Sequence, residues 1–182
     1  MNRQRLRGLL LALASSLALA APTGAAAATA SDSAPEVQAL VDAIHKHRAS
    51  VWHWQRVMGR KPMTTHFMER QTSDIVHLTF LRDTWRKRAL RVQARALRPS
   101  HRRQWICIQG HEGRWDDPNA PYYGGLQMDL QFQRAYGRYL LRRKGTANRW
   151  SPEEQMWTAE KALRAGRGFY PWPLSARRCG LI

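Results

Sequence analysis

After its first thirty residues the chain carries apolar side chains every three or four positions, a spacing that places them on one face of a helix. A capping serine, a proline and a glutamate predict that the first helix begins within residues 33–36. Gly59 predicts its end. A second helix is expected from the threonine pair 64–65, with a break near residues 72–74. The sequence therefore predicts a helical N-terminal region over residues 31–100.

The first thirty residues have the composition of a secretory signal peptide. Three arginines precede an uncharged run of Leu, Ala and Ser at residues 9–20, and small residues at 18–20 and 28–30 offer cleavage sites. Twelve residues of helix reach only about 18 Å, whereas the hydrocarbon core of a membrane is about 30 Å thick. We therefore expect residues 1–30 to be removed on export, leaving no transmembrane anchor. The protein is then expected to be secreted or held at the cell wall.

Residues 31–182 carry 27 basic and 13 acidic residues, and such an excess of positive charge attracts polyanions. Outside a cell the candidates are wall polymers, anionic lipids and acidic glycans, and no specific nucleic acid is expected as a partner. Nine basic residues and one acid fall within residues 82–103. This segment is either a patch for an anionic wall polymer or a solvated helix face in an arginine-rich protein.

The two cysteines of the chain, Cys107 and Cys179, predict one disulfide, because an even count in an exported protein is typical of a bridge. The bridge would close a loop of 73 residues. Closing such a loop stabilises a fold by about 4 kcal/mol in the chain-entropy model. No metal-ligand spacing occurs among His45, His47, His53 and His66. We predict neither a metal nor a cofactor.

The last eighty residues are denser in Trp, Gly and Pro, and they predict shorter elements. Residues 103–111 are expected to form a helix, and residues 122–128 a short hairpin. Asp129 is expected to cap a helix that runs to about Lys144. A capping box predicts another helix over residues 151–166. The aromatic segment after it, up to residue 173, is expected to lie across a surface as a strap.

Glu112 is the candidate for acid chemistry, since it lies at the end of an apolar helix between Ile108 and Trp115. Apolar surroundings disfavour the charged form of a carboxyl, so such a residue can stay protonated and donate a proton to a leaving oxygen. The other interpretation of Glu112 is a surface residue or a helix cap.

Aromatic and amide side chains follow Glu112 and are candidates for sugar binding. Gln127 offers both a donor and an acceptor, which suits hydroxyls or an N-acetyl group. Four aromatic residues either line a groove that stacks against sugar rings or fill the core, namely Trp115, Tyr122, Tyr123 and Trp172.

Four separated blocks occur in one order, at residues 105–115, 122–129, 154–155 and 168–173. Together they resemble the transglycosylase-like domain of resuscitation-promoting factors, over about residues 105–181. The resemblance implies a small lysozyme-like domain of helices with a short hairpin. The expected fold class is therefore mainly α, with residues 101–182 as an α+β catalytic domain behind the helical N-terminal region.

The resemblance also implies roles for single residues. Glu112 takes the place of the catalytic acid, and Gln127 and Asp129 take the places of residues in the substrate groove. The family usually has a cysteine directly before the acid, where this chain has His111. Cys107 lies one helical turn earlier, so a bridge between this helix and the C-terminal strap is expected in a shifted position.

The resulting expectation is an exported enzyme that cuts the glycan strands of peptidoglycan. Most glycosidases use two carboxylates, and Asp129, Asp116 and Asp117 are candidates for the second, with Asp129 favoured by the resemblance. Attack by water makes the enzyme a muramidase, and attack by the sugar's own 6-hydroxyl makes it a lytic transglycosylase. The alternatives are a carbohydrate-binding module without catalysis and a secreted cationic protein that binds polyanions.

Overall fold

The computed structural model describes residues 25–66, 69 and 72–182. The chain divides into two units, Met1–Ala34 and Pro35–Ile182, and the second is described by itself below. Residues 1–24 of the expected signal peptide lie outside the described residues. Helix α1 spans Ala25–Val57 and contains Pro35, so the expected helix start within residues 33–36 is wrong. The alanine-rich sequence before Ser33 has a high helix propensity and extends the helix toward the N-terminus.

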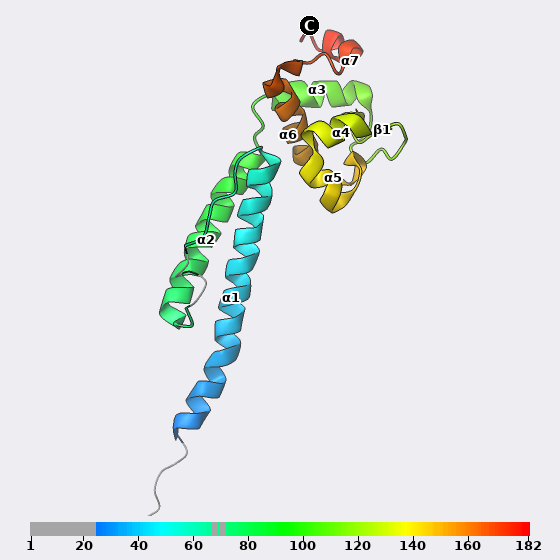
Figure 1. The fold of residues 1–182 in the computed structure, drawn as a ribbon. Coiled ribbons are helices and arrows are strands. Elements are labelled where there is room, and N and C mark those ends of the chain that lie inside the picture. The colour runs from blue at the N-terminus through cyan, green and yellow to red at the C-terminus, as the bar shows by residue number, and fades with distance from the viewer. Residues whose placement is uncertain (1–24, 67–68, 70–71) are drawn as a thin grey trace, which may run out of the picture. The chain divides into compact units, whose positions relative to one another are not determined.

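Helix α2 covers Ile75–Ala96 and packs beside α1 (Figure 1). Its N-cap is Asp74, whose side chain accepts a hydrogen bond from the backbone N–H of Val76. The expected helix start at residues 64–65 is therefore wrong, and the expected break near residues 72–74 is where α2 begins. The chain before it is held in a non-helical course by Trp52, whose indole N–H donates to the carbonyl of Met63 at 2.8 Å.

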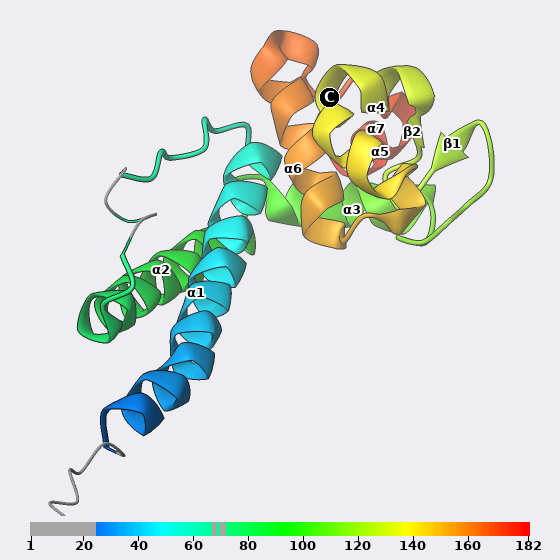
Figure 2. The same ribbon diagram turned by 60° about the horizontal axis from the view of Figure 1, so that its bottom comes forward.

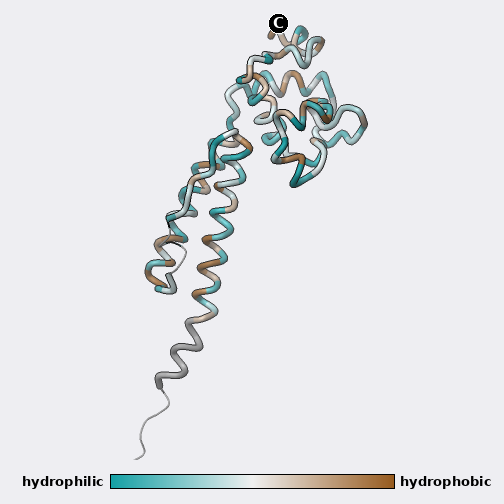
Figure 3. The backbone as a smooth tube through the Cα atoms, in the orientation of Figure 1, coloured by the Kyte–Doolittle hydropathy of each residue, from teal (hydrophilic) through white to brown (hydrophobic). Residues whose placement is uncertain are grey.

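Hydrophilic and hydrophobic residues alternate along α1 and α2 (Figure 3), as expected for helices with one buried face. The buried residues form one hydrophobic cluster between the two helices. Its members are Leu40, Ile44, Val51, Leu78, Leu81, Trp85 and Ala89. Helices α1 and α2 thus make up most of the predicted helical N-terminal region, whereas residues 58–66 and 72–74 between them are not helical.

Short helices make up most of the chain after residue 100 (Figure 2). Their bounds are α3 Arg102–Glu112, α4 Leu130–Tyr136, α5 Arg138–Lys144, the 3-10 helix η2 Ala147–Arg149, α6 Pro152–Ala162, the π-helical turn η3 Leu163–Arg167 and α7 Pro173–Arg178. The sheet is a two-stranded antiparallel hairpin of β1 Tyr122–Tyr123 and β2 Met128–Asp129. Tyr122 lies opposite Asp129, and Tyr123 lies opposite Met128. The expected mainly helical fold with a short hairpin is therefore confirmed.

The single helix expected from Asp129 to Lys144 is two helices, because the chain leaves helical geometry at Gly137. A side chain at this position would place its Cβ 2.4 Å from Cη2 of Trp150, so the ring packs directly on the backbone. The cap at Asp129 and the end at Gly145 are as expected. Close packing of a residue from outside the helix explains a break that local sequence does not predict.

The expected capping box at the start of α6 is present, with reciprocal bonds between Ser151 and Glu154. The helix changes to the π-helical turn η3 before Gly166, which has a φ of 82°. The strap after it is shorter than expected, because Pro173 opens α7. Proline is favoured in the first turn of a helix, where its missing N–H costs nothing.

A second hydrophobic cluster forms the core of the helices after residue 100, and it includes Val57, Met58 and Ala96 from the ends of α1 and α2. The indole N–H of Trp157 donates to the carbonyl of Ala96 at 2.7 Å, which ties α6 to the end of α2. Among the described residues, no helix is long and apolar enough to cross a membrane.

Candidate functional site

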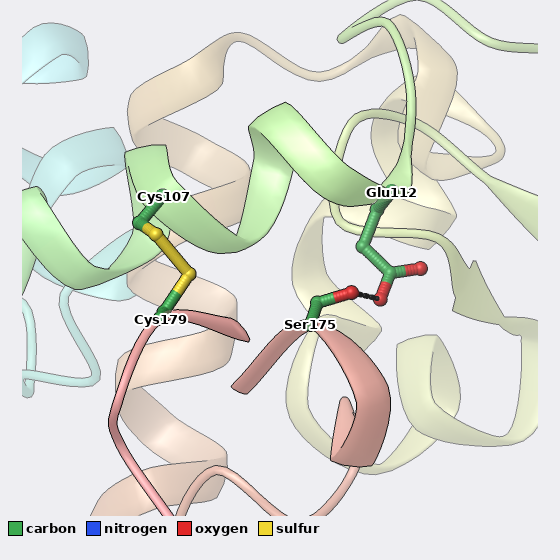
Figure 4. Close-up of a disulfide and its surroundings, with 4 residues drawn as sticks. All are labelled: Cys107, Glu112, Ser175 and Cys179. Carbon is green, nitrogen blue, oxygen red and sulfur yellow. Dashed lines mark hydrogen bonds between the residues drawn. A yellow bond between two sulfur atoms is a disulfide. The ribbon is translucent and has the colours of Figure 1, made fainter. Parts of the chain in front are cut away.

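Glu112 is the last residue of α3, and its carboxylate points to Ser175 on α7 (Figure 4). The Ser175 hydroxyl donates to Oε1 of Glu112 at 2.5 Å. Ser175 is buried, whereas Glu112 is half-buried. One carboxylate oxygen of Glu112 is therefore fixed by the protein, and the other has no hydrogen-bond partner among the described residues.

The expected disulfide between Cys107 and Cys179 is present and joins α3 to the end of α7 (Figure 4). The two Cα atoms lie 6.0 Å apart. The bridge holds α7 against the helix that carries Glu112, so it also holds Ser175 in reach of the carboxylate. His111 is exposed and lies beside the two sulfur atoms, with the three potential ligand atoms within 4.8 Å of one another. Because both sulfur atoms are bonded to each other, this group does not offer thiolates to a metal.

Gln127 lies beside the residue that follows Glu112. A Cβ at Gly113 would sit 3.0 Å from Nε2 of Gln127, so only glycine allows this approach without displacement. The Gln127 amide donates to Oδ2 of Asp117 and to the carbonyl of Gly124, both at 2.9 Å. Gln127 also adopts a φ of 44°, in the left-handed region that side chains rarely enter. A strained backbone at a residue whose side-chain amide donates two hydrogen bonds, next to the glycine that follows a candidate acid, makes Gln127 a candidate functional position.

An open pocket of about 400 Å³ lies next to this amide. It is lined by Tyr122, Gln127, Met128, Asp129, Gln131, Phe132, Ala135, Tyr136, Arg167, Pro171 and Trp172. Gln127 belongs both to the pocket wall and to the surroundings of Gly113. Glu112 and Gly113 do not themselves line the pocket, so Gln127 is the residue that connects the candidate acid to it.

Asp129 combines two of the roles expected for it. Its Oδ1 accepts a hydrogen bond from the backbone N–H of Phe132 at 2.6 Å, which caps α4. The same residue lines the pocket. Within the described part of the chain, Oδ2 of Asp129 has no hydrogen-bond partner. This oxygen is available to a hydroxyl or to water.

The other two carboxylates are engaged in the loop after α3. Asp116 pairs with Arg114 at 2.9 Å on the surface, and the hydrogen bond from Arg114 lowers the pKa of Asp116. Asp117 accepts from Gln127 and from both the backbone and the side chain of Asn119. Asp117 thus lies closer to the pocket, and its oxygens hold the loop and Gln127 in place.

The four aromatic candidates take different places. Tyr122 is 51% exposed and lines the pocket, so its ring can stack against a ligand. Trp172 lines the pocket but is only 4% exposed, and its indole N–H donates to the carbonyl of Leu126 at 2.6 Å. Trp115 and Tyr123 are partly buried against the core and do not line this pocket. The structure therefore brings together Tyr122, Gln127, Asp129 and the edge of Trp172.

Arg167 is a pocket residue that the sequence analysis did not identify. It is exposed, and it follows Gly166 and precedes Gly168, which have φ values of 82° and 57°. Both values lie in the left-handed region, where glycine is favoured. Two such glycines turn the chain at Arg167, and the spacing Gly-Arg-Gly is the signal that could have drawn attention to it.

Gln155 supports the site from the inside and was also missed as a functional residue. It is buried, and its Nε2 donates to the carbonyls of Trp115, Ala147 and Trp150. Its side chain also packs on Gly124, where a Cβ would lie 2.6 Å from Oε1 of Gln155. One buried amide therefore fixes both the loop after α3 and the turn of the hairpin.

No family model, curated protein or solved structure matches this chain.

Proposed function

We propose that this chain is an exported enzyme that cuts the glycan strands of bacterial peptidoglycan, with Glu112 as the general acid. The observation that carries the proposal is the position of this carboxylate. Glu112 is oriented by a buried hydroxyl, and the residue after it contacts an amide that lines an open pocket. A carboxyl fixed beside a groove is what protonation of a glycosidic oxygen requires.

The composition of the pocket supports a sugar ligand. Its wall presents tyrosine and phenylalanine rings beside amides and a carboxylate, which matches the apolar faces and hydroxyl edges of a hexose. Arg167 adds a positive charge at the pocket wall. Peptidoglycan differs from neutral glycans by the carboxylates of its peptide stems, or of the free lactyl group where the stem is absent, and a guanidinium binds such groups well.

Cleavage proceeds by transfer of the Glu112 proton to the oxygen between N-acetylmuramic acid and N-acetylglucosamine. As the bond from this oxygen to the muramic acid C1 breaks, a positive charge develops on the sugar that keeps C1. Asp129 is the favoured second carboxylate, since it lines the pocket and only its Oδ1 is used in capping α4, so Oδ2 can orient water or stabilise this charge. Attack on C1 by water gives a reducing sugar, and attack by the 6-hydroxyl gives an anhydro sugar with one water less.

The resemblance to resuscitation-promoting factors adds to this proposal. The disulfide from the acid-bearing helix to the end of α7 agrees with the shifted bridge that the resemblance implies. The proposed domain is lysozyme-like and covers residues 101–182. The proposed location is outside the cell or at the wall, where a disulfide is stable. Anionic wall polymers are then among the polyanions that its positive charge would meet.

The test is digestion of purified peptidoglycan by the chain beginning at residue 31 and by its Glu112→Gln variant, with mass spectrometry of the products. The wild type is expected to release muropeptides, and the variant to be slower by about a hundred- to ten-thousandfold. Glu36→Gln, which changes an exposed glutamate of α1, is the matched control and is expected to digest normally. Product mass separates hydrolysis from formation of the anhydro sugar.

The competing functions give different results in the same assay. A carbohydrate-binding module binds glycan fragments and releases no product with either glutamate or glutamine at position 112. A cationic polyanion-binding protein likewise releases no product, and its binding falls steeply with salt and is unchanged in Glu112→Gln. Either result removes the enzyme proposal.

A further inference from the structure

Helix α2 exposes large apolar side chains on the side opposite its buried one. The exposed fractions are 79% for Val76, 63% for Phe80, 58% for Leu90 and 48% for Leu97, the residue that follows the helix. At 3.6 residues per turn these four positions fall within an arc of about 100°. Leu97 continues this arc as the C-cap. Ordinary soluble helices do not keep an apolar stripe of this kind in water, so this side has the character of an interaction surface.

Positive charges lie within and beside this stripe. Lys87 and Arg91 fall on the same side of the helix, and Arg86 and Arg95 flank it. All four are exposed. We call the four apolar residues together with these four cations the outer face of α2.

The outer face has almost no negative charge of its own. Helix α2 contains six basic residues and one acid, Asp83. That acid is paired with Arg82 at 2.9 Å. Arg88 is not part of the outer face, since its guanidinium lies over the buried Trp85 ring at 4.8 Å. Asp83 also lies near Arg86 and Lys87, but one acid does not balance the four cations, so the outer face keeps a net positive charge that can bind an external anion.

The pairing of apolar and basic side chains identifies the kind of partner. A hydrated polyanion would bind only the cations of the outer face and would leave its apolar side chains exposed to water. A second copy of the same helix would bring two sets of cations together. A bilayer that contains anionic lipid accepts both, because headgroups bind the cations while Phe80 and Leu90 enter the boundary with the acyl chains.

We infer that the outer face of α2 binds the surface of an anionic lipid bilayer, with the helix lying in the plane of the interface. The inference does not depend on the proposed enzymatic function. It assigns to the helical N-terminal region the task of holding the protein at a membrane without spanning it.

The test is flotation of the chain beginning at residue 31 with lipid vesicles. This chain keeps the whole unit Pro35–Ile182 and omits the apolar run at residues 9–20, which would bind lipid itself. Vesicles of phosphatidylglycerol mixed with phosphatidylcholine are compared with vesicles of phosphatidylcholine alone. Soluble polyglutamate serves as an anion without an apolar phase.

Two double variants separate the two contributions. Phe80→Ser with Leu90→Ser removes apolar contacts, and it is expected to weaken binding to anionic vesicles at least about tenfold while leaving polyglutamate binding unchanged. Lys87→Gln with Arg91→Gln removes charge, and it is expected to weaken vesicle binding about thirtyfold and to weaken polyglutamate binding as well. Phosphatidylcholine vesicles are expected to bind weakly in every case.

Matched controls change equally exposed residues elsewhere. Tyr170→Ser alters a side chain that is 71% exposed, and Arg138→Gln with Arg142→Gln removes two exposed charges of α5. Both controls are expected to bind anionic vesicles as the wild type does. Circular dichroism verifies that each variant is folded. Peptidoglycan digestion by the Phe80 and Leu90 double variant is measured in parallel, so that a failure of the membrane-binding inference is distinguished from a failure of the proposed enzymatic function.

Three results would overturn the inference. The first is absence of binding to anionic vesicles by the wild type. The second is vesicle binding that the Phe80 and Leu90 double variant retains in full, which would make the outer face a simple polyanion surface. The third is self-association of the wild type that this double variant abolishes, without any lipid binding, which would make a second copy the partner.

Discussion

The hydroxyl of Ser175 donates a hydrogen bond of 2.5 Å to the carboxylate of Glu112, although the two residues are 63 positions apart in the chain. This bond makes the direction of the candidate acid depend on α7, a helix of six residues at the C-terminal end. Ser175 is therefore a positioning residue. Its contribution can be separated from that of Glu112.

Replacing Ser175 with alanine is expected to slow the release of muropeptides about tenfold or more, because a hydrogen bond to a carboxylate stabilises its geometry by about 1.5–3 kcal/mol. Substrate affinity is expected to change little, since Ser175 does not line the pocket. Initial rates over a range of substrate concentrations separate kcat from KM. Ser175→Thr retains the hydroxyl and is expected to restore most of the rate; equal losses in both variants would assign the effect to packing.

Replacing both Cys107 and Cys179 with serine is expected to lower the free energy of unfolding by about 4 kcal/mol. The two cysteines are 72 positions apart, and without the bridge the unfolded chain regains the conformational entropy that the closed loop removes. Denaturant unfolding of the wild type, with and without a reducing agent, gives the same comparison without mutation. The double variant should not respond to the reducing agent. Mass spectrometry of non-reduced peptides with free thiols at both positions would contradict the bridge itself.

Local signals predicted most elements of this fold, and two of the exceptions come from contacts with residues outside the element concerned. The Ser151 capping box, the Asp129 cap and the hairpin follow from neighbouring residues alone. The break at Gly137 follows from Trp150, which lies outside the helix that it interrupts. No helical periodicity carries that information.

The candidate site divides in the same way. Residue type and local context predicted Glu112 and Gln127 as candidates; Gln127 lines the pocket, and Glu112 does not. Ser175 and Gln155 were missed, since a serine and a glutamine gain their roles only from partners 63 and 40 residues away. Trp172 looks like a sugar platform in the sequence, but most of its surface packs in the core.

Replacing Arg167 with alanine is expected to weaken binding of muropeptides by about tenfold, because the pocket loses its guanidinium. Chitin fragments of equal length lack the peptide carboxylates of muropeptides, so their affinity is expected to stay the same. Calorimetric titration of Glu112→Gln, with and without the Arg167 change, measures both ligands in the absence of turnover. Arg164→Ala, which removes a neighbouring arginine outside the pocket, tests whether general loss of charge suffices.

Glu154 is expected to make the fold sensitive to acid. Burial raises the pKa of this carboxyl, but hydrogen bonds from His53 at 2.9 Å and Lys144 at 2.7 Å outweigh it, and the pKa is lowered below 4.5. A carboxyl whose pKa is lower in the folded than in the unfolded chain stabilises the fold at pH values above its unfolded pKa. This contribution disappears as the pH falls from about 4.5 through the folded value.

Glu154→Gln is expected to be less stable at neutral pH by about 3–5 kcal/mol, because the charges around it lose their partner. The difference from the wild type should shrink as the pH falls below about 4.5. Urea unfolding at several pH values measures this difference. Glu153→Gln changes the neighbouring, half-exposed glutamate and should give a nearly constant difference instead.

Lys161 is expected to make the fold more stable as the pH rises into the alkaline range. Burial, together with the nearby charge of Arg164, lowers the pKa of this amine from 10.5 to about 8. Its aliphatic chain lies against Gly59, where a Cβ would be 3.3 Å from Cδ of Lys161. Below about pH 8 both folded and unfolded chains hold the proton, and the buried charge destabilises the fold.

As the pH rises from about 8 to 10.5, the folded chain releases this proton first, so the free energy of unfolding gains up to about 3 kcal/mol from this group. Lys161→Met removes the charge and keeps much of the aliphatic chain, so it should be more stable than the wild type near neutral pH by about 1–3 kcal/mol. That advantage should fall steadily toward about pH 10, as urea unfolding at each pH would reveal. Lys46→Met, at an exposed lysine of α1, is the matched control and should show no such trend. A Lys161→Met variant that is no more stable near pH 7 would mean that the buried amine has a partner or water that relieves its charge.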